Sequence, residues 1–209
     1  MTPDGPYTDA FFADVERTSV SSARRVVPVA VAGWRPASVI DVGCGEGIWA
    51  AVFEAEGVPA VGVDGEYVRP ERRLVDRFVV WDLSQPLPAL GRYDLAVCLE
   101  VAEHLPASSA ASFVAGLAGL ADRILFSAAV PGQGGTDHIN EQPHEYWIER
   151  FVAAGFRADV AWREQFAADE DVAWWYRQNM IVFTRRSSRN MVVPKGLRGR
   201  WWRRAWHDT

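Results

Sequence analysis

Short β-branched runs alternate along the chain with stretches whose apolar residues recur at helical spacing. The runs are bounded by turn residues and predict strands over residues 38–42, 60–64, 77–81, 94–99 and 122–128. Helical spacing predicts helices between most of them, notably over residues 48–56 and 108–120. Because strand and helix alternate, we expect a parallel sheet. Runs that are apolar throughout, such as VIDV and LAVCL, indicate that helices cover both faces of this sheet.

The two ends of the chain depart from this alternation. Residues 8–33 have helical spacing that Pro28 interrupts, so we expect two helical pieces before the first strand. A later helix is expected over residues 146–154, ending at a glycine. Beyond it, residues 158–166 and 174–184 predict two long strands that pair antiparallel and are joined by the acidic loop AADED.

The length and composition of the chain suit one soluble domain. Its 209 residues, 49% of them hydrophobic, are enough for one core. We expect the domain over residues 1–184, with a helical cap over 1–35 and a basic, Trp-rich tail over 185–209. Cys44 and Cys98 lack the close spacing of a disulfide framework, which favours a reducing, cytoplasmic setting. Neither a leader peptide nor a membrane span is expected.

The charge of the chain is unevenly distributed. The formal net charge is −5, yet eight Lys and Arg residues against one Asp crowd residues 185–209, so the rest is more acidic still. A body this acidic makes nucleic acid an unlikely partner, since each phosphate contact requires a Lys or Arg. The tail, where Trp201, Trp202 and Trp206 alternate with Arg residues, could dock on an anionic surface or pack on the acidic body.

A glycine loop follows the first predicted strand. Gly43, Gly45 and Gly47 open the next helix, so the backbone can approach a ligand while the N–H groups of the helix N-terminus face its carboxylate. The triplet alone also suits the pyrophosphate of a nicotinamide cofactor. An oxidoreductase is therefore one alternative at this point.

Carboxylates at neighbouring strand ends narrow the choice of ligand. Asp41 stands two residues before the glycine loop, and Asp64 ends the next strand, where it can accept both hydroxyl protons of a ribose. Asp82 ends the third strand with Leu83 beside it, a pair that can recognise adenine through a carboxylate and a backbone N–H. Each Asp alone could be a helix or turn cap. Together they predict an adenosine-containing ligand.

Four segments carry a family resemblance. VIDVGCGEG, VGVDG, WDLSQPL and YDLAVCLEVAEHL resemble class I S-adenosylmethionine (SAM)-dependent methyltransferases, over residues 38–184. The resemblance implies a Rossmann-like α/β fold whose seven-stranded sheet is mostly parallel with a C-terminal antiparallel strand. It also implies SAM as cofactor, with its methionine end at residues 43–47, its ribose at Asp64 and Gly65, its adenine at Asp82 and Leu83, and its amino group near Glu100. The stretch FSAAVPGQGGTDHINEQPHEYW also resembles small bacterial and phage methyltransferase-domain proteins.

Histidines are the candidates for acid–base chemistry, because their pKa suits neutral pH. His104 follows the fourth strand beside the predicted cofactor and is the leading catalytic candidate, with a structural role as the alternative. His138 and Asn140 fall on the loop after the fifth strand, where we expect contact with the methyl acceptor. His144 could contact the acceptor or begin the next helix.

A divalent cation such as Mg²⁺ is a further hypothesis. Glu100, Glu103, His104 and a later histidine, His138 or His144, supply the oxygen and nitrogen ligands of such a site. The pattern ExxEH with a later His is similar to ubiquinone-pathway O-methyltransferases and small-RNA terminal 2′-O-methyltransferases, where an ion engages the acceptor hydroxyls. Glu103 is thereby also a catalytic candidate. Alternatively, Glu100 contacts the cofactor and Glu103 faces water.

Two tyrosines complete the candidate substrate contacts. Tyr176 lies in the aromatic run WWY and is expected either to line the acceptor pocket or to pack in the core, and Tyr7 could fold over the cofactor as a lid. The expected function is SAM-dependent O-methylation of a small-molecule hydroxyl or carboxyl, on a sugar or natural-product intermediate. N-methylation, a nicotinamide-dependent oxidoreductase and a non-catalytic SAM-binding module stay open.

Overall fold

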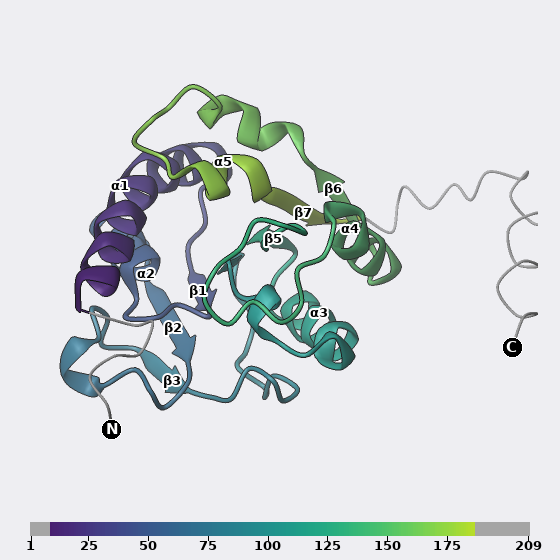
Figure 1. The fold of residues 1–209 in the computed structure, drawn as a ribbon, viewed down its shortest axis with the longest axis horizontal. Helices are drawn as coiled ribbons and strands as arrows, with labels where there is room; N and C mark the ends of the chain where they lie inside the picture. The colour runs from purple at the N-terminus through teal and green to yellow at the C-terminus, as the bar shows by residue number, and fades with distance from the viewer. Residues whose placement is uncertain (1–8, 187–209) are drawn as a thin grey trace, which may run out of the picture.

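The computed structural model describes residues 9–186 and contains one seven-stranded sheet (Figure 1). The sheet order is β3-β2-β1-β4-β5-β7-β6, and β7 alone runs antiparallel to its neighbours. This confirms the predicted α/β class. The strands are β1 (Val39–Val42), β2 (Ala60–Asp64), β3 (Phe78–Val80), β4 (Leu95–Leu99), β5 (Arg123–Ser127), β6 (Phe156–Asp159) and β7 (Ile181–Arg185). The helices are α1 (Asp9–Trp34), α2 (Ile48–Ala55), α3 (Ala110–Leu120), α4 (His144–Ala153) and α5 (Trp174–Asn179).

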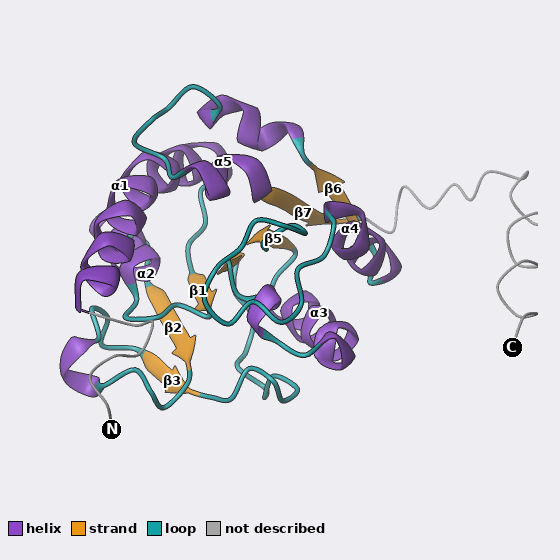
Figure 2. Ribbon diagram, in the orientation of Figure 1, coloured by secondary structure: helices purple, strands orange, loops and turns teal. Residues whose placement is uncertain are grey.

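Helices cover both faces of the sheet, as the apolar strands predict (Figure 2). One buried cluster lies between the sheet and the helices α3 and α4, and the other between the sheet and α1, α2 and α5. Successive residues of a strand point to opposite faces, so Ala96 and Cys98 of β4 belong to the first cluster, whereas Leu95 and Val97 belong to the second. The burial of each large side chain in these clusters contributes about 1.5–3 kcal/mol.

The N-terminal helix differs from the sequence prediction. We expected two helical pieces, but α1 is continuous through Pro28. Proline removes one backbone hydrogen bond and normally kinks or ends a helix. Here Val27 and Ala30 are fully buried on either side of the proline and pack in the cluster shared with α2, so tertiary packing holds the helix together.

The predicted C-terminal strands are also partly wrong. The chain forms β6 only up to Asp159 and then a 3-10 helix over Ala161–Phe166, and residues 174–179 form α5 rather than the first half of β7. Within α5, Tyr176 and Asn179 are buried, and their three-residue spacing is helical. The aromatic run WWY has a high β propensity and was therefore predicted as a strand, but packing against the core overrides this propensity and favours the helix.

The order of the strands brings the predicted site residues to one edge of the sheet. β1 lies between β2 and β4, so the chain reverses its direction of winding at the β1–β4 pair. Ligands of open α/β sheets bind outside the carboxyl ends of the strands at this point. None of the described helices is long and apolar enough to cross a membrane.

Candidate functional site

The glycine turn after β1 has the conformation that its sequence requires. Gly43, Gly45 and Gly47 have φ angles of 79°, 56° and 94°, which L side chains rarely adopt. A Cβ on Gly43 would lie 2.2 Å from a γ-carbon of Val101, so this glycine lets the β1 turn approach the end of β4. A Cβ on Gly45 would meet no atom within 4 Å. The turn is therefore closely packed against Val101 at Gly43 and has open space at Gly45.

Asp41 is a buried carboxyl within β1. Its Oδ2 atom makes no hydrogen bond with the described residues. Burial, followed by repulsion from the Asp64 carboxylate, raises the pKa of Asp41 to about 7. An incompletely paired carboxyl in the interior is costly, and it is the kind of atom that a bound cationic group satisfies.

Asp64 ends β2 and lies against the glycine turn. Its carboxylate accepts hydrogen bonds from the backbone N–H groups of Gly45 (2.6 Å) and Gly65 (2.7 Å) and from the hydroxyl of Tyr67. The Tyr67 ring lies over Gly65, where a Cβ would be 2.5 Å from a ring carbon. Sequence reasoning missed Tyr67, whose hydroxyl already occupies the carboxylate expected to bind a ribose.

Asp82 and Leu83 follow β3 at the neighbouring strand end. Asp82 is exposed, its Oδ1 accepts the N–H of Ser84 at 2.9 Å, and hydrogen bonds from Ser84 lower its pKa. Leu83 is buried. The N–H of Trp81 donates to the backbone oxygen of Asp64 (2.8 Å). Asp82 and Leu83, which follow Trp81 directly, therefore come next to the end of β2.

Glu100 directly follows β4 with a left-handed backbone, at φ 55°. Side-chain amides hold its carboxylate, since Gln133 Nε2 donates to Oε2 (3.0 Å) and Asn179 Nδ2 donates to Oε1 (3.2 Å). A residue other than glycine in this conformation is strained by about 1–3 kcal/mol, which the surrounding contacts must offset. Gln133 and Asn179 were not among the predicted residues. Asn179 lies 79 positions from Glu100, and no local pattern pairs the two.

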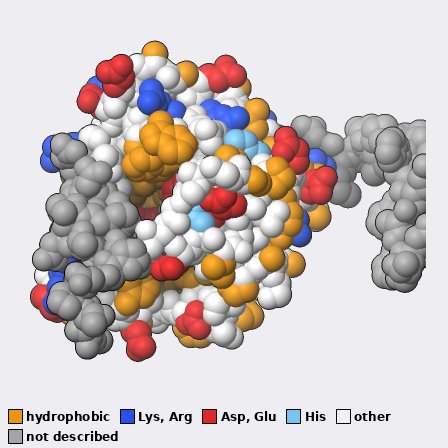
Figure 3. Space-filling view, viewed as in Figure 1, with side chains coloured by type: hydrophobic (Ala, Val, Ile, Leu, Met, Phe, Trp, Pro, Cys, Tyr) orange, Lys and Arg blue, Asp and Glu red, His pale blue; other side chains and the backbone are white. Residues whose placement is uncertain are grey.

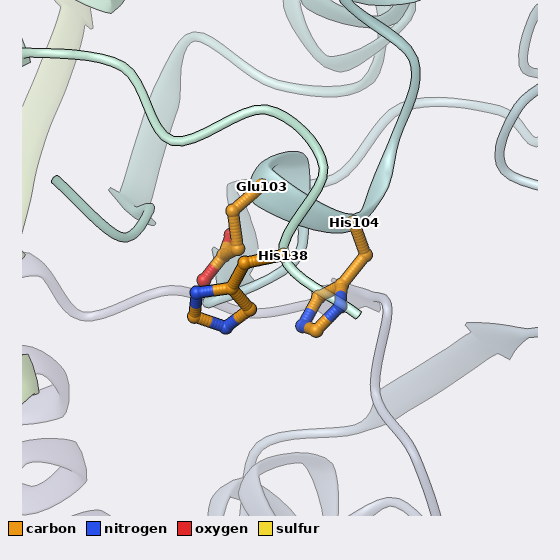
Figure 4. A group of neighbouring side chains, drawn as sticks. All are labelled: Glu103, His104 and His138. Atoms are coloured by element: carbon orange, nitrogen blue, oxygen red, sulfur yellow. The ribbon is translucent and has the colours of Figure 1, made fainter. Parts of the chain in front are cut away.

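Glu103, His104 and His138 form a cluster beside this strand end (Figure 4). Glu103 and His104 come from the 3-10 helix Ala102–His104 and His138 from the loop after β5. One ligand atom from each lies within 4.8 Å of the other two. The imidazole rings of His104 and His138 meet edge to face, with centroids 4.9 Å apart. Glu100 is outside this group of three, so the structure brings together three of the four predicted cation ligands.

Glu103 is the unusual member of this cluster. It is fully buried, and neither carboxyl oxygen has a hydrogen-bond partner among the described residues. Burial first, and repulsion from Glu100 second, raise the pKa of Glu103 to about 9. Burial also lowers the pKa of His104, with His138 as the second cause. The cluster therefore contains a protonated carboxyl beside imidazoles at neutral pH.

The loop that carries His138 is fixed by its own polar groups. Glu141, which was not among the predicted site residues, accepts a hydrogen bond from His138 Nδ1 (2.9 Å). The N–H groups of Ile139 and Asn140 both donate to the backbone oxygen of Glu103 at 2.9 Å. The Asn140 side chain is buried, donates to the backbone oxygen of Ala102 and accepts from Gln142. The Asn140 side chain is thus hydrogen-bonded within the protein. Its contact with the methyl acceptor stays a prediction.

The other predicted substrate residues lie at different depths. His144 begins α4, and its Nε2 lies 3.4 Å from Asn179 Oδ1; burial and then Arg163 lower its pKa. Tyr176 is buried in α5, with its ring edge-on to Trp49 and its hydroxyl 3.5 Å from the Ser19 hydroxyl. Tyr7 lies outside the described residues. The space-filling view shows His and acidic side chains together near the middle of one face (Figure 3).

Comparisons with known proteins relate part of this chain to a known domain family. Residues 21–122 match a family described as a methyltransferase domain. This range holds the glycine turn, Asp41, Asp64 and the cluster residues Glu103 and His104. A search of curated proteins gives no match.

Several solved structures with the same fold are methyltransferases. The magnesium protoporphyrin IX methyltransferase from Synechocystis PCC 6803, with bound SAM, has a TM-score of 0.63 at 22% identity over 88% of this chain and 87% of that chain. The sugar N-methyltransferase KedS8 from Streptoalloteichus sp. ATCC 53650 has a TM-score of 0.63 at 17% identity, over 90% and 97% of the two chains. The methyltransferase domain of bacterial CtHen1 has a TM-score of 0.53 at 18% identity, over 78% and 98%. Residues 21–122 therefore match a methyltransferase domain, and the chain has the fold of class I SAM-dependent methyltransferases.

Proposed function

We propose that the protein transfers the methyl group of SAM to an oxygen of a small molecule, a hydroxyl or carboxyl of a sugar or natural-product intermediate. The observation that carries the proposal is the burial of Glu103 beside His104 and His138, with no hydrogen-bond partner for its carboxyl among residues 9–186. Native proteins rarely leave a buried carboxyl unpaired, and such groups are characteristic of functional sites. The cluster lies at the carboxyl end of β4, next to the edge where class I methyltransferases bind their cofactor.

The residues around the glycine turn fit SAM. The open side of Gly45 leaves room for the methionine end, and the unpartnered oxygen of Asp41 suits its cationic groups. Asp64 and Gly65 would hold the ribose once Tyr67 releases the carboxylate, and Asp82 and Leu83 would hold the adenine. Gly43 and Gly47 shape the turn, and Glu100 would face the amino group of SAM. This assignment rests on the convergence of these residues at one strand edge.

The cluster would prepare the acceptor for transfer. SAM supplies a methyl group on a positively charged sulfur, so the protein has to align the acceptor and manage its proton. Alignment can supply about 7–11 kcal/mol of the barrier, and a positioned base contributes on the order of 10²–10⁴-fold in rate. An imidazole of His104 or His138 can take the proton of a hydroxyl, whereas Glu103, protonated at neutral pH, can donate a hydrogen bond to the acceptor. His144, Asn140 and Tyr176 then belong to the surroundings of the acceptor.

A divalent cation is a second candidate for the same cluster. Two imidazoles and a buried carboxyl form a donor set that suits a first-row ion such as Mn²⁺, and less well Mg²⁺, which prefers oxygen ligands. Such an ion would replace the proton of Glu103 and lower the pKa of an acceptor hydroxyl. Glu103, His104 and His138 would hold it, and Glu100, already bound by two amides, would not.

The organisation of the chain around this site is part of the proposal. The proposed domain covers residues 1–184; strand β7 continues to Arg185, and the N–H of Arg186 donates to the backbone oxygen of Gly155. A cytoplasmic location and a small-molecule partner fit the proposed reaction. The predicted contact of the Trp-rich tail with an anionic surface concerns residues outside those described.

Methyl transfer from labelled SAM into small-molecule extracts tests the proposal. We expect label in a small-molecule product whose mass and hydrolysis identify an O-methyl group. SAM at about 100 times its Kd should stabilise the protein by about 2.7 kcal/mol, whereas NAD should not. The double variant H104Q/H138Q should bind SAM normally but transfer label about 100-fold more slowly. The variant E149Q, which changes an exposed glutamate of α4, is the control.

Three results would contradict parts of the proposal. Full activity in the double variant would exclude the histidines from acid–base work and positioning. An N-methyl product would replace the oxygen acceptor by a nitrogen acceptor. Activity that is indifferent to a chelator would exclude the cation and leave the imidazoles as the acceptor-activating groups.

A further inference from the structure

The loop after β5 contains a carboxylate that serves one histidine of the cluster. Glu141 Oε1 accepts hydrogen bonds from His138 Nδ1 (2.9 Å) and from the N–H of Gly134 (2.9 Å), and Oε2 accepts the N–H of Gly132 (2.8 Å). The side chains of His138 and Glu141 are only 12% and 19% exposed. Three donors from the same loop therefore converge on this carboxylate.

We propose that Glu141 is a positioning residue that makes His138, rather than His104, the base for the methyl acceptor. The proposal rests on the proposed function, because it assigns a role within the same acceptor site. A carboxylate that receives three N–H groups acts only as an acceptor. The proton of the neutral imidazole is therefore on Nδ1, and the lone pair that can bind an acceptor proton is on Nε2.

The residues around the His138 imidazole fix the orientation of the ring as well as the nitrogen that carries the proton. Gly135 has a φ angle of 154°, and a Cβ at this position would lie 2.3 Å from both Cε1 and Nε2 of His138. The ring is thus placed between the Glu141 carboxylate and a glycine backbone. The glycine-rich sequence GQGG supplies two N–H groups that hold Glu141 and the space that the imidazole occupies.

Among residues 9–186, no carboxylate accepts a hydrogen bond from His104. Its Nδ1 lies 3.3 Å from the backbone oxygen of Asp137, a neutral acceptor, and its side chain is exposed. A carboxylate stabilises an imidazolium, whereas a carbonyl does so much less. When the acceptor oxygen bonds to the methyl carbon, the electron pair of the S–C bond stays on sulfur and the acceptor proton passes to Nε2 of His138. Glu141 offsets the charge that forms on the ring, and the proton then leaves to water.

Nuclear magnetic resonance of ¹⁵N-histidine-labelled full-length protein tests the positioning without any methyl acceptor. The His138 signals, assigned by their loss in H138Q, should show a proton on Nδ1 in the wild type. In E141A the proton should move to Nε2, the position that free imidazole side chains favour. An Nδ1 proton that persists in folded E141A would overturn the proposal. Because no acceptor is needed, this result is separate from the success of the methyl-transfer experiment.

The rate of methyl transfer tests the role of the pair in the reaction. E141Q keeps the size of the side chain but removes its charge, and with the acceptor that the labelled-SAM experiment identifies we expect kcat to fall about 10–100-fold. The Kd for SAM should not change, and E149Q should match the wild type. A kcat of E141Q within twofold of the wild type would overturn the proposal. This test does not depend on E141A, so it also holds if E141A fails to fold.

Discussion

Replacing Glu103 by Gln should stabilise the protein at alkaline pH relative to the wild type. The carboxyl is fully buried with no hydrogen-bond partner in the described part of the chain, and its pKa is about 9 in the folded protein against 4.5 for an unperturbed group. Between these values the folded protein holds a proton that the unfolded chain has released. Stability is therefore greatest below pH 4.5 and falls as the pH rises, by about 1.4 kcal/mol for each pH unit.

The size of the effect follows from this pH window. At pH 7 the wild type should have lost about 3 kcal/mol of its unfolding free energy through Glu103. Gln cannot ionise, so E103Q escapes this loss, but its buried N–H groups cost about 1–3 kcal/mol at every pH. The absolute stabilities can therefore cross. The difference in unfolding free energy between E103Q and the wild type should shift by about 4 kcal/mol in favour of the variant from pH 5 to pH 8.

Urea unfolding of both proteins between pH 5 and 8, in the presence of a chelator, measures this difference. E149Q is the matched control, because it removes an exposed carboxylate and should follow the wild type. Adding Mn²⁺ should restore stability to the wild type and not to E103Q if an ion replaces the proton. Parallel pH profiles for E103Q and the wild type would refute a raised pKa of Glu103.

Two further changes test the cofactor side of the sheet edge. Y67F removes the hydroxyl that competes for Asp64, so the Kd for SAM in calorimetry should decrease about tenfold. An unchanged Kd would show that this contact does not compete with SAM. G43A places a Cβ against Val101 at a positive φ and should cost roughly 2–4 kcal/mol of stability, part of which V101A should restore. G45A is the control, because it has the strain of a positive φ but open space, and an equal loss in both variants would assign the cost to φ alone.

The sequence predicted the parallel part of the fold well because that part has a strong local signal. Apolar runs bounded by turn residues located β1 to β5, and strand alternation with helices ordered them. The errors occur where packing competes with propensity. Pro28 does not interrupt α1, because Val27 and Ala30 anchor both sides in the core. Aromatic residues favour strands in isolation, yet Tyr176 packs from a helix.

The candidate site could likewise be predicted where a local sequence pattern locates its residues, and not where their position depends on packing. Residues adjacent to strand ends, such as Asp64 and Glu103, follow from the pattern, because parallel strands bring their carboxyl ends together. Asn179 could not be predicted, since its contact with Glu100 depends on how α5 packs. Glu141 left a weak signal, because it lies three residues after His138 in the sequence.

The carboxyl groups at this edge of the sheet differ in how they are paired, and the difference follows the proposed roles. Asp64 and Glu100 receive N–H donors within the protein, whereas Asp41 and Glu103 are buried with oxygens that no described residue hydrogen-bonds. The unpaired groups are the two whose pKa is raised, to about 7 and about 9. Burying such groups opposes folding, so their retention requires a compensating ligand or reaction. A cationic cofactor near Asp41 and an acceptor proton or metal ion near Glu103 would each supply the missing partner.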